Sequence, residues 1–203
     1  MVNTTEIYVA GEKDLRYLPD IEKAIFDSAS VKGTGIAVRS RKYLTEKIRA
    51  GKSVIAIHYD GSWAGFCYIE SWGHKKFVAN SGLVVNPLFR GQGLAGRIKY
   101  KAKELSAELF PGSKLFGLTT SLAVMKINSS LGYKPVTFSE LTDDNDFWSG
   151  CESCPYYDIL IRTKRSHCLC TAMLLEGLGE QSGTENKPGE KKDDQDQLKN
   201  YAA

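Results

Sequence analysis

The stretch Val85-Asn86-Pro87-Leu88-Phe89-Arg90-Gly91-Gln92-Gly93-Leu94-Ala95 decides the fold. An apolar strand pattern ends at Val85, Pro87 turns the chain, and a glycine-rich loop opens a long helix. Gly91 and Gly93 can take positive φ, which lets the backbone approach a ligand closely. The first amides of a helix lack internal partners, so together with the helix dipole they form a site for a pyrophosphate. We expect the diphosphate of a cofactor to be bound by Arg90, Gly91, Gln92, Gly93, Leu94 and Ala95.

The same glycines also fit a rival pattern. Gly91-x-Gly93-x-x-Gly96 matches the dinucleotide fingerprint G-x-G-x-x-G. That fingerprint places its first glycine directly after a strand and an acidic residue about 20 residues later, at the end of the next strand. Here the segment Pro87 to Arg90 intervenes, and the next strand pattern, residues 114–121, contains no acid. A nicotinamide-dinucleotide site is therefore disfavoured, as is an ordinary glycine turn with no ligand.

Strand and helix patterns alternate along the chain, with three consecutive strands joined by tight turns before the glycine-rich loop. The expected helices span residues 14–30, 40–50, 93–110 and 122–130. The expected strands span residues 6–10, 53–59, 63–72, 77–85, 114–121, 134–139, 156–162 and 167–174. This order predicts an α/β fold with a mixed sheet, in which antiparallel N-terminal strands are followed by parallel strands and helices cover both faces.

Length and composition point to one domain over residues 1–175 and a disordered polar tail over residues 176–203. The tail carries seven acids and four lysines, which leaves 23 basic and 17 acidic residues in the domain. This modest positive balance suits a small anionic ligand and is weak for a nucleic-acid partner. No apolar run is long enough to span a membrane, and no signal peptide is evident, so a cytoplasmic protein without a membrane partner is expected.

The motif Val85-x-Pro87-x-x-Arg90-Gly91-x-Gly93-Leu94-Ala95 resembles the acetyl-CoA signature of the GNAT superfamily of N-acetyltransferases. The order of elements and the segment Leu131-Gly132-Tyr133-Lys134-Pro135 resemble that family as well. Segments 65–72 and 135–138 are similar to short, single-domain members that resemble N-acetylglutamate synthases. The resemblance implies acetyl-CoA or another acyl-CoA as cosubstrate. It also implies that main-chain amides of Leu83, Val84 and Val85 bind the thioester carbonyl and the pantetheine arm.

The resemblance implies that an amine attacks the thioester directly. Many relatives carry a tyrosine that protonates the departing sulfur, four residues before the glycine of the Leu-Gly-Tyr segment. Here that residue is Asn128, which can donate a hydrogen bond but not a proton. Glu70 is our candidate general base, with His74 and Glu140 as alternatives. A base is less needed for an α-amino group, which titrates near 8 in peptides.

The acceptor is expected to meet residues 31–41, because the family uses the region between its first helices as an acceptor loop. Lys32 and Arg39 are the candidate substrate-binding residues, since both can bind a carboxylate. A small amino-acid amine is favoured, glutamate for arginine biosynthesis among them, with an acetyl or a succinyl group transferred. The alternatives are a peptide or protein N-acetyltransferase and a catalytically weak acyl-CoA-binding regulator. A homodimer is left open.

Two cysteine pairs, Cys151-x-x-Cys154 and Cys168-x-Cys170, admit a four-thiolate zinc site. If residues 156–174 form a hairpin, the two pairs lie at opposite ends of it. Tetrahedral binding needs all four sulfurs within about 2.3 Å of the metal. Buried, metal-free thiols are therefore the favoured interpretation.

Overall fold

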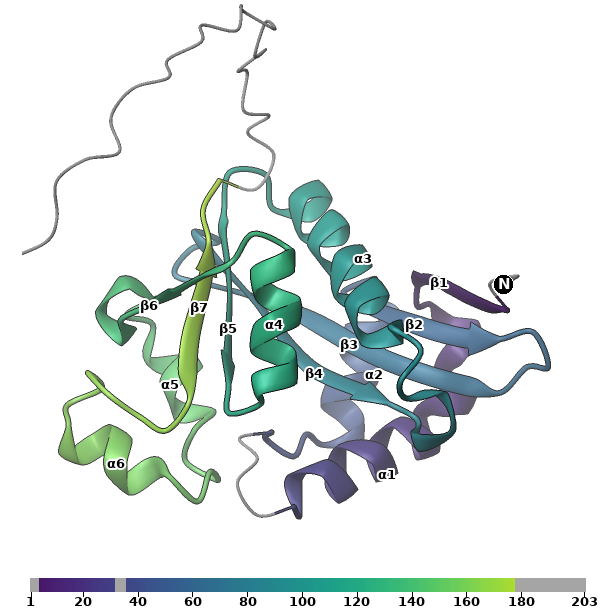
Figure 1. The fold of residues 1–203 in the computed structure, drawn as a ribbon, viewed down its shortest axis with the longest axis horizontal. Helices are drawn as coiled ribbons and strands as arrows, with labels where there is room; N and C mark the ends of the chain where they lie inside the picture. Colours follow the sequence, from purple (N-terminus) through teal and green to yellow (C-terminus); the bar gives the residue numbers. More distant parts are fainter. Residues whose placement is uncertain (1–3, 32–35, 178–203) are drawn as a thin grey trace, which may run out of the picture.

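The computed structural model describes residues 4–31 and 36–177, so Lys32 and the polar tail from residue 178 onward lie outside the described residues. A seven-stranded sheet runs in the order β1-β2-β3-β4-β5-β7-β6 (Figure 1). Its strands are β1 (Thr5–Val9), β2 (Ser53–His58), β3 (Trp63–Trp72), β4 (Phe77–Val85), β5 (Lys114–Thr119), β6 (Lys134–Val136) and β7 (Thr171–Leu175). Only the pair β4–β5 is parallel among these neighbours. The expected mixed α/β sheet is confirmed.

Helices cover both faces of the sheet, as expected (Figure 1). One face packs against α3 (Leu94–Leu109) and α4 (Leu122–Ser130), and the other against α1 (Leu18–Ala29), α2 (Arg41–Arg49), α5 (Asn145–Ser149) and α6 (Tyr157–Arg162). Alternation along β3 divides these cores, because Cys67 faces α3 whereas Phe66 and Tyr68 face α1 and α2. Across residues 4–31 and 36–177, every helix is too short or too polar to cross a bilayer.

The sheet opens between β4 and β5. These two strands pair only where Phe77, Val78 and Ala79 lie beside Lys114, Leu115 and Phe116, and beyond those residues they diverge. Just past this point β4 carries a bulge, because Gly82 and Leu83 both lie opposite the single residue Cys67 of β3. Gly82 has a φ of +64°. Beyond Ala79 and Phe116, β4 and β5 therefore form no main-chain pairs with each other, and a ligand can pass between them.

The first expected helix, residues 14–30, is two elements. A 3₁₀-helix (Glu12–Tyr17) precedes α1, which begins at Leu18. Pro19 occupies the first turn of α1, where its missing amide hydrogen costs no hydrogen bond. The proline therefore sets where the α-helix starts and does not kink it.

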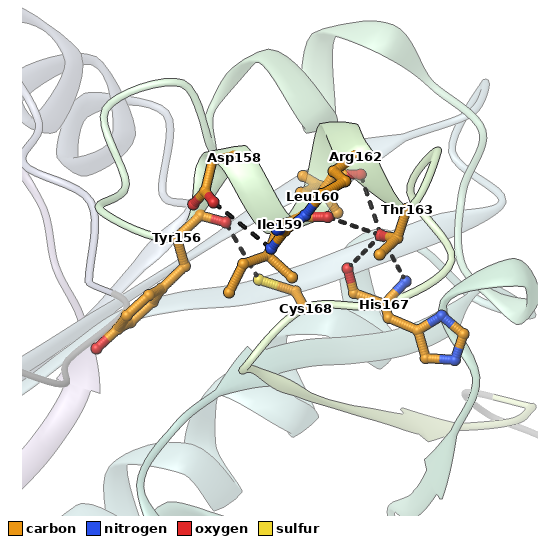
Figure 2. Close-up of polar contacts among 8 residues, drawn as sticks. All are labelled: Tyr156, Asp158, Ile159, Leu160, Arg162, Thr163, His167 and Cys168. Carbon is orange, nitrogen blue, oxygen red and sulfur yellow. Dashed lines mark hydrogen bonds and ion pairs between the residues drawn. The ribbon is translucent and has the colours of Figure 1, made fainter.

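The strand expected at residues 156–162 is wrong, because this segment is α6 (Figure 2). Its aromatic and β-branched residues favour a strand, but only Leu160 is fully buried, against the cluster that includes Trp148. The Thr163 hydroxyl contacts the main-chain carbonyls of Ile159, at 2.8 Å, and His167, at 2.8 Å. Since α6 leaves no hairpin partner, β7 pairs instead with β5 and β6.

Candidate functional site

The glycine-rich loop lies in the open at the N-terminus of α3. Gly91 and Gly93 have φ values of +76° and +71°, which a residue with a side chain rarely adopts. Gly93 is the N-cap, so no side chain caps the first amides of the helix. Methyl groups added to Gly91, Gly93 or Gly96 would meet no atom within 4 Å. The helix N-terminus therefore has room for an anionic ligand to approach its main-chain donors.

The side chains of this loop divide into an anchor and an exposed rim. Leu94 is buried on the side of α3 that faces the sheet, and the adjacent Ala95 is half-buried. Arg90 and Gln92 are exposed, and the Arg90 Nε donates to the main-chain oxygen of Val85 at 3.2 Å. The buried Leu94 side chain thus anchors the loop, while the side chains of Arg90 and Gln92 remain exposed to solvent.

A cavity of about 520 Å³ occupies the opening between β4 and β5. Its central walls are the diverging strand segments, and side chains from both faces of the sheet line its two ends. Leu83 lines this cavity. Val84 packs in the core beneath α1 and α2, and Val85 lies against the α3 core, so neither side chain lines the cavity.

One end of the cavity, which we call the acceptor end, is lined by Arg39, Tyr43, Tyr68 and Glu70. The Arg39 Nε donates to the Tyr68 hydroxyl at 3.0 Å, and its guanidinium lies 5.5 Å from the Tyr43 ring centre. The Tyr43 hydroxyl donates to Glu70 at 3.2 Å, and Lys47 forms an ion pair with the same carboxylate. Arg39 and Glu70 therefore line the same end of the cavity, and each is held by a tyrosine hydroxyl.

The other end, which we call the cofactor end, lies beneath α3 and α4 and is lined by Asn80, Lys99 and Asn128. Asn128 is 1% exposed, and its Nδ2 donates to the Met173 sulfur at 3.5 Å. Tyr133, which follows α4, is also buried, and its main-chain amide donates to the main-chain oxygen of Asn128 at 3.0 Å. The Leu-Gly-Tyr segment thereby fixes the turn that holds Asn128 at the cavity.

The two alternative bases lie elsewhere. His74 is in the turn between β3 and β4, with a φ of +55°. Glu140 accepts from the main-chain amide of Thr137 at 2.9 Å and so caps the short helix that follows β6. Neither residue lines the cavity, whereas Glu70 does.

The four cysteines lie closer together than a hairpin would place them. Cys151, Cys154, Cys168 and Cys170 all line the acceptor-end wall that α5 and α6 build. Burial, followed by the neighbouring thiols, raises the pKa of Cys170 to about 12. Across the described part of the chain, no three His, Cys, Asp or Glu side chains are placed to hold a metal ion.

Sequence reasoning missed Lys99, Tyr43 and Tyr68. For Lys99 a signal exists, because it lies among the buried positions of α3, Ile98 and Ala102, where a lysine is out of place. No local pattern marks the two tyrosines, since α2 and β3 meet only in the fold.

No protein-family model and no curated protein matches the chain. Among solved structures, Rv2747 from Mycobacterium tuberculosis in complex with CoA is similar, with a TM-score of 0.62 and 16% identity over 84% of this chain and 98% of that one. N-acetylglutamate synthase from Neisseria gonorrhoeae, complexed with coenzyme A and N-acetyl-glutamate, has a TM-score of 0.61 and 17% identity over 87% of this chain and 35% of that one. A GNAT superfamily phosphinothricin acetyltransferase from Sinorhizobium meliloti, in complex with AcCoA, has a TM-score of 0.57 and 17% identity over 92% of this chain and 95% of that one.

The chain has the GNAT fold. The sequence resemblance assigned acyl-CoA to the glycine-rich loop, which lies at the N-terminus of α3, and to the main chain of residues 83–85, which lies at the end of β4. This chain spans about one third of the Neisseria synthase, and so corresponds to one part of that protein.

Proposed function

We propose that the protein is an acyl-CoA-dependent N-acyltransferase that acts on the amine of a small amino acid. The observation that carries this proposal is the cavity between β4 and β5, which is lined by Leu83 and Lys99 on the side of α3 and by Arg39 and Glu70 on the other side. Similar structures bind CoA or AcCoA, which supports the same cosubstrate here.

On the cofactor end, the diphosphate binds the first amides of α3, with Arg90 adding a charge-assisted contact. The pantetheine arm then follows the edge of β4 toward the bulge at Gly82 and Leu83. Main-chain donors released by that bulge stabilise the developing oxyanion, which is the most effective use of preorganised dipoles in acyl transfer.

On the acceptor end, Arg39 binds a carboxylate of the substrate, and Glu70, directly or through water, takes the proton from its amine. The side chains of α5, α6 and the following loop line this end of the cavity, opposite Arg39 and Glu70. A charged pocket of this size supports a small amino acid over a peptide or protein substrate, which needs an open groove. Glutamate is our first candidate, since the Neisseria synthase of the same fold is complexed with N-acetyl-glutamate.

The experiment is a panel of amino acids and peptides tested against acetyl-CoA and succinyl-CoA, with release of free CoA thiol as the readout. We expect turnover with an acidic amino acid and none with peptides, and Arg90→Ala to raise the KM for acyl-CoA while leaving the acceptor KM unchanged. Thermal protection by acyl-CoA without turnover of any amine contradicts the proposal and favours a ligand-binding regulator.

A further inference from the structure

Lys99 is a buried lysine at the cofactor end. It exposes 2% of its surface, lines the cavity, and forms no ion pair with a carboxylate among the described residues. Its Nζ lies 5.7 Å from the centre of the Tyr133 ring. A buried ammonium without a partner is strongly destabilising. The position of Lys99 therefore calls for a role beyond packing.

Unsatisfied polar atoms occur on two side chains that line the cavity with Lys99, and on the neighbouring Tyr133. The Asn80 Nδ2, the Asn128 Oδ1 and the Tyr133 hydroxyl are buried and have no hydrogen-bond partner within the described chain. Buried polar atoms in native proteins are nearly always paired. The two unsatisfied amide groups that line the cavity with Lys99, on Asn80 and Asn128, indicate that a polar ligand there completes their hydrogen bonding.

The place of Lys99 along α3 matches the path of a thioester. Lys99 follows the N-cap Gly93 by six residues, which is about 9 Å along the helix axis. The helix lies over the sheet beside β4 (Figure 1), so a pantetheine arm that leaves its N-terminus and enters the opening between β4 and β5 passes this side chain.

We propose that the Lys99 ammonium donates the proton that the CoA sulfur takes up as the thioester bond breaks. This inference rests on the proposed acyl transfer. The amine nitrogen bonds to the carbonyl carbon, the C–S bond breaks with its electron pair on sulfur, and sulfur takes a proton from the Lys99 Nζ. The proton lost by the amine passes to Glu70 or solvent, and neutral Lys99 recovers its proton from solvent after CoA leaves.

The acidity of Lys99 suits this step. Burial lowers its pKa, against a smaller opposing effect of Cys67, so its ammonium is a stronger acid than that of an ordinary lysine. The other titratable groups that face Lys99 are Cys67 and Tyr133, and burial raises the pKa of both, so neither competes as donor.

The test compares Lys99→Met and Lys99→Arg with the matched control Lys103→Met. Lys103 lies one turn further along α3, donates to the main-chain oxygen of Leu131 at 3.2 Å and does not line the cavity. Thermal melting checks folding, and Lys99→Met should melt no lower than the wild type because it removes a buried charge.

The first readout needs no acceptor. CoA labelled with ¹³C at the carbon bonded to sulfur is titrated by NMR when bound to each protein. We expect the bound thiol to have a pKa below its value in free CoA, with the shift lost in Lys99→Met and retained in Lys103→Met. An unshifted thiol in the wild type, or equal shifts in both variants, overturns the placement of Lys99 beside the sulfur.

The second readout is the pH dependence of kcat. We expect the wild-type rate to fall at high pH as Lys99 loses its proton, and Lys99→Met to be slower by about 100-fold or more without that fall. Arginine keeps the charge but cannot release a proton, so Lys99→Arg should stay slow. Restoration by arginine, or an unchanged profile in Lys99→Met, overturns proton donation. If the wild type turns over no amine, the proposed function fails, while the thiol titration still decides whether Lys99 faces the sulfur.

Discussion

The two sides of the proposed site are built in different ways. The glycine-rich loop before α3, which lies outside the cavity lining, is one continuous segment, in which main-chain amides and two glycines of positive φ leave the helix N-terminus open. The acceptor end of the cavity is made of side chains from α2 and the residues before it, from β3 and from the C-terminal segment around α5 and α6, including Arg39, Glu70 and Cys151.

This difference separates cofactor binding, which depends on the backbone, from acceptor recognition, which depends on particular side chains. A helix N-terminus binds a diphosphate with any side chains nearby, because the donors belong to the backbone. Recognition of the acceptor depends on which charges several distant segments bring together. We therefore expect changes in the loop to alter acyl-CoA binding alone, and changes at the acceptor end to alter the rate or the acceptor KM.

The largest effect is expected for Glu70→Gln. Loss of the proposed base should lower kcat by about 100-fold or more with little change in the KM for acyl-CoA. Glu46→Gln, on the exposed side of α2, is the matched control and should keep full activity. Steady-state kinetics decide this, and a Glu70→Gln variant as active as Glu46→Gln removes Glu70 from the mechanism.

Arg39→Met should raise the acceptor KM by about 10-fold to 100-fold, since a hydrogen bond to a charged group contributes about 1.5–3 kcal/mol. The KM for acyl-CoA should stay the same. Arg41→Met provides the comparison, because Arg41 binds Glu22 at 2.8 Å and does not line the cavity. If both substrates lose affinity together, the separation of the two ends is wrong.

Gly93→Ala should weaken CoA binding by roughly 10-fold, because an alanine there strains the backbone and crowds the helix N-terminus. Gly112, in the turn after α3, has a similar φ of +77° and the same open surroundings. Gly112→Ala should therefore cost similar stability, about 1 kcal/mol, and leave CoA binding intact. Calorimetric titration and thermal melting measure the two effects, and equal losses of CoA affinity would show that strain alone is responsible.

The sequence predicts the cofactor end better than the acceptor end for a physical reason. Alternation over residues 53–85 and the glycine-rich loop are local signals, and the structure has β2, β3, β4 and α3 within a residue or two of the expected bounds. Residues 156–162 carry strand-forming side chains, yet they form α6 because only Leu160 finds a buried partner. Such a tertiary contact has no local signature.

Arg39 shows the same limit in the site. Its charge alone did not distinguish it from Arg41 in the sequence, and only the packing of α2 against β3 turns Arg39 toward Tyr68 and leaves Arg41 with Glu22. Glu70 could be predicted as a site residue because it lies near the end of a strand pattern. Tyr43 and Lys47, which contact its carboxylate, come from α2, and no sequence pattern identifies them.

The smallest effect concerns the thiols of the acceptor end. Burial, followed by Cys154 and Cys168, raises the pKa of Cys151 to about 11. At pH 7.5 its thiolate fraction is then roughly 300-fold below that of an ordinary cysteine, so alkylation by iodoacetamide should be slower than that of glutathione in the same tube by a similar factor. The rate should rise about tenfold for each pH unit, because the thiolate is the reacting species.

Mass spectrometry of the labelled peptides measures this rate. Adding the acceptor or CoA then shows which end of the cavity protects the thiol. The acceptor should slow labelling of Cys151, which lines the same wall as Arg39, whereas CoA alone should leave the rate unchanged. A chelator should have no effect on neutral, metal-free thiols. Rapid labelling that appears only after chelation would instead mean that a metal holds the four sulfurs as thiolates, and the acceptor end would then be organised by a metal as well as by Arg39 and Glu70.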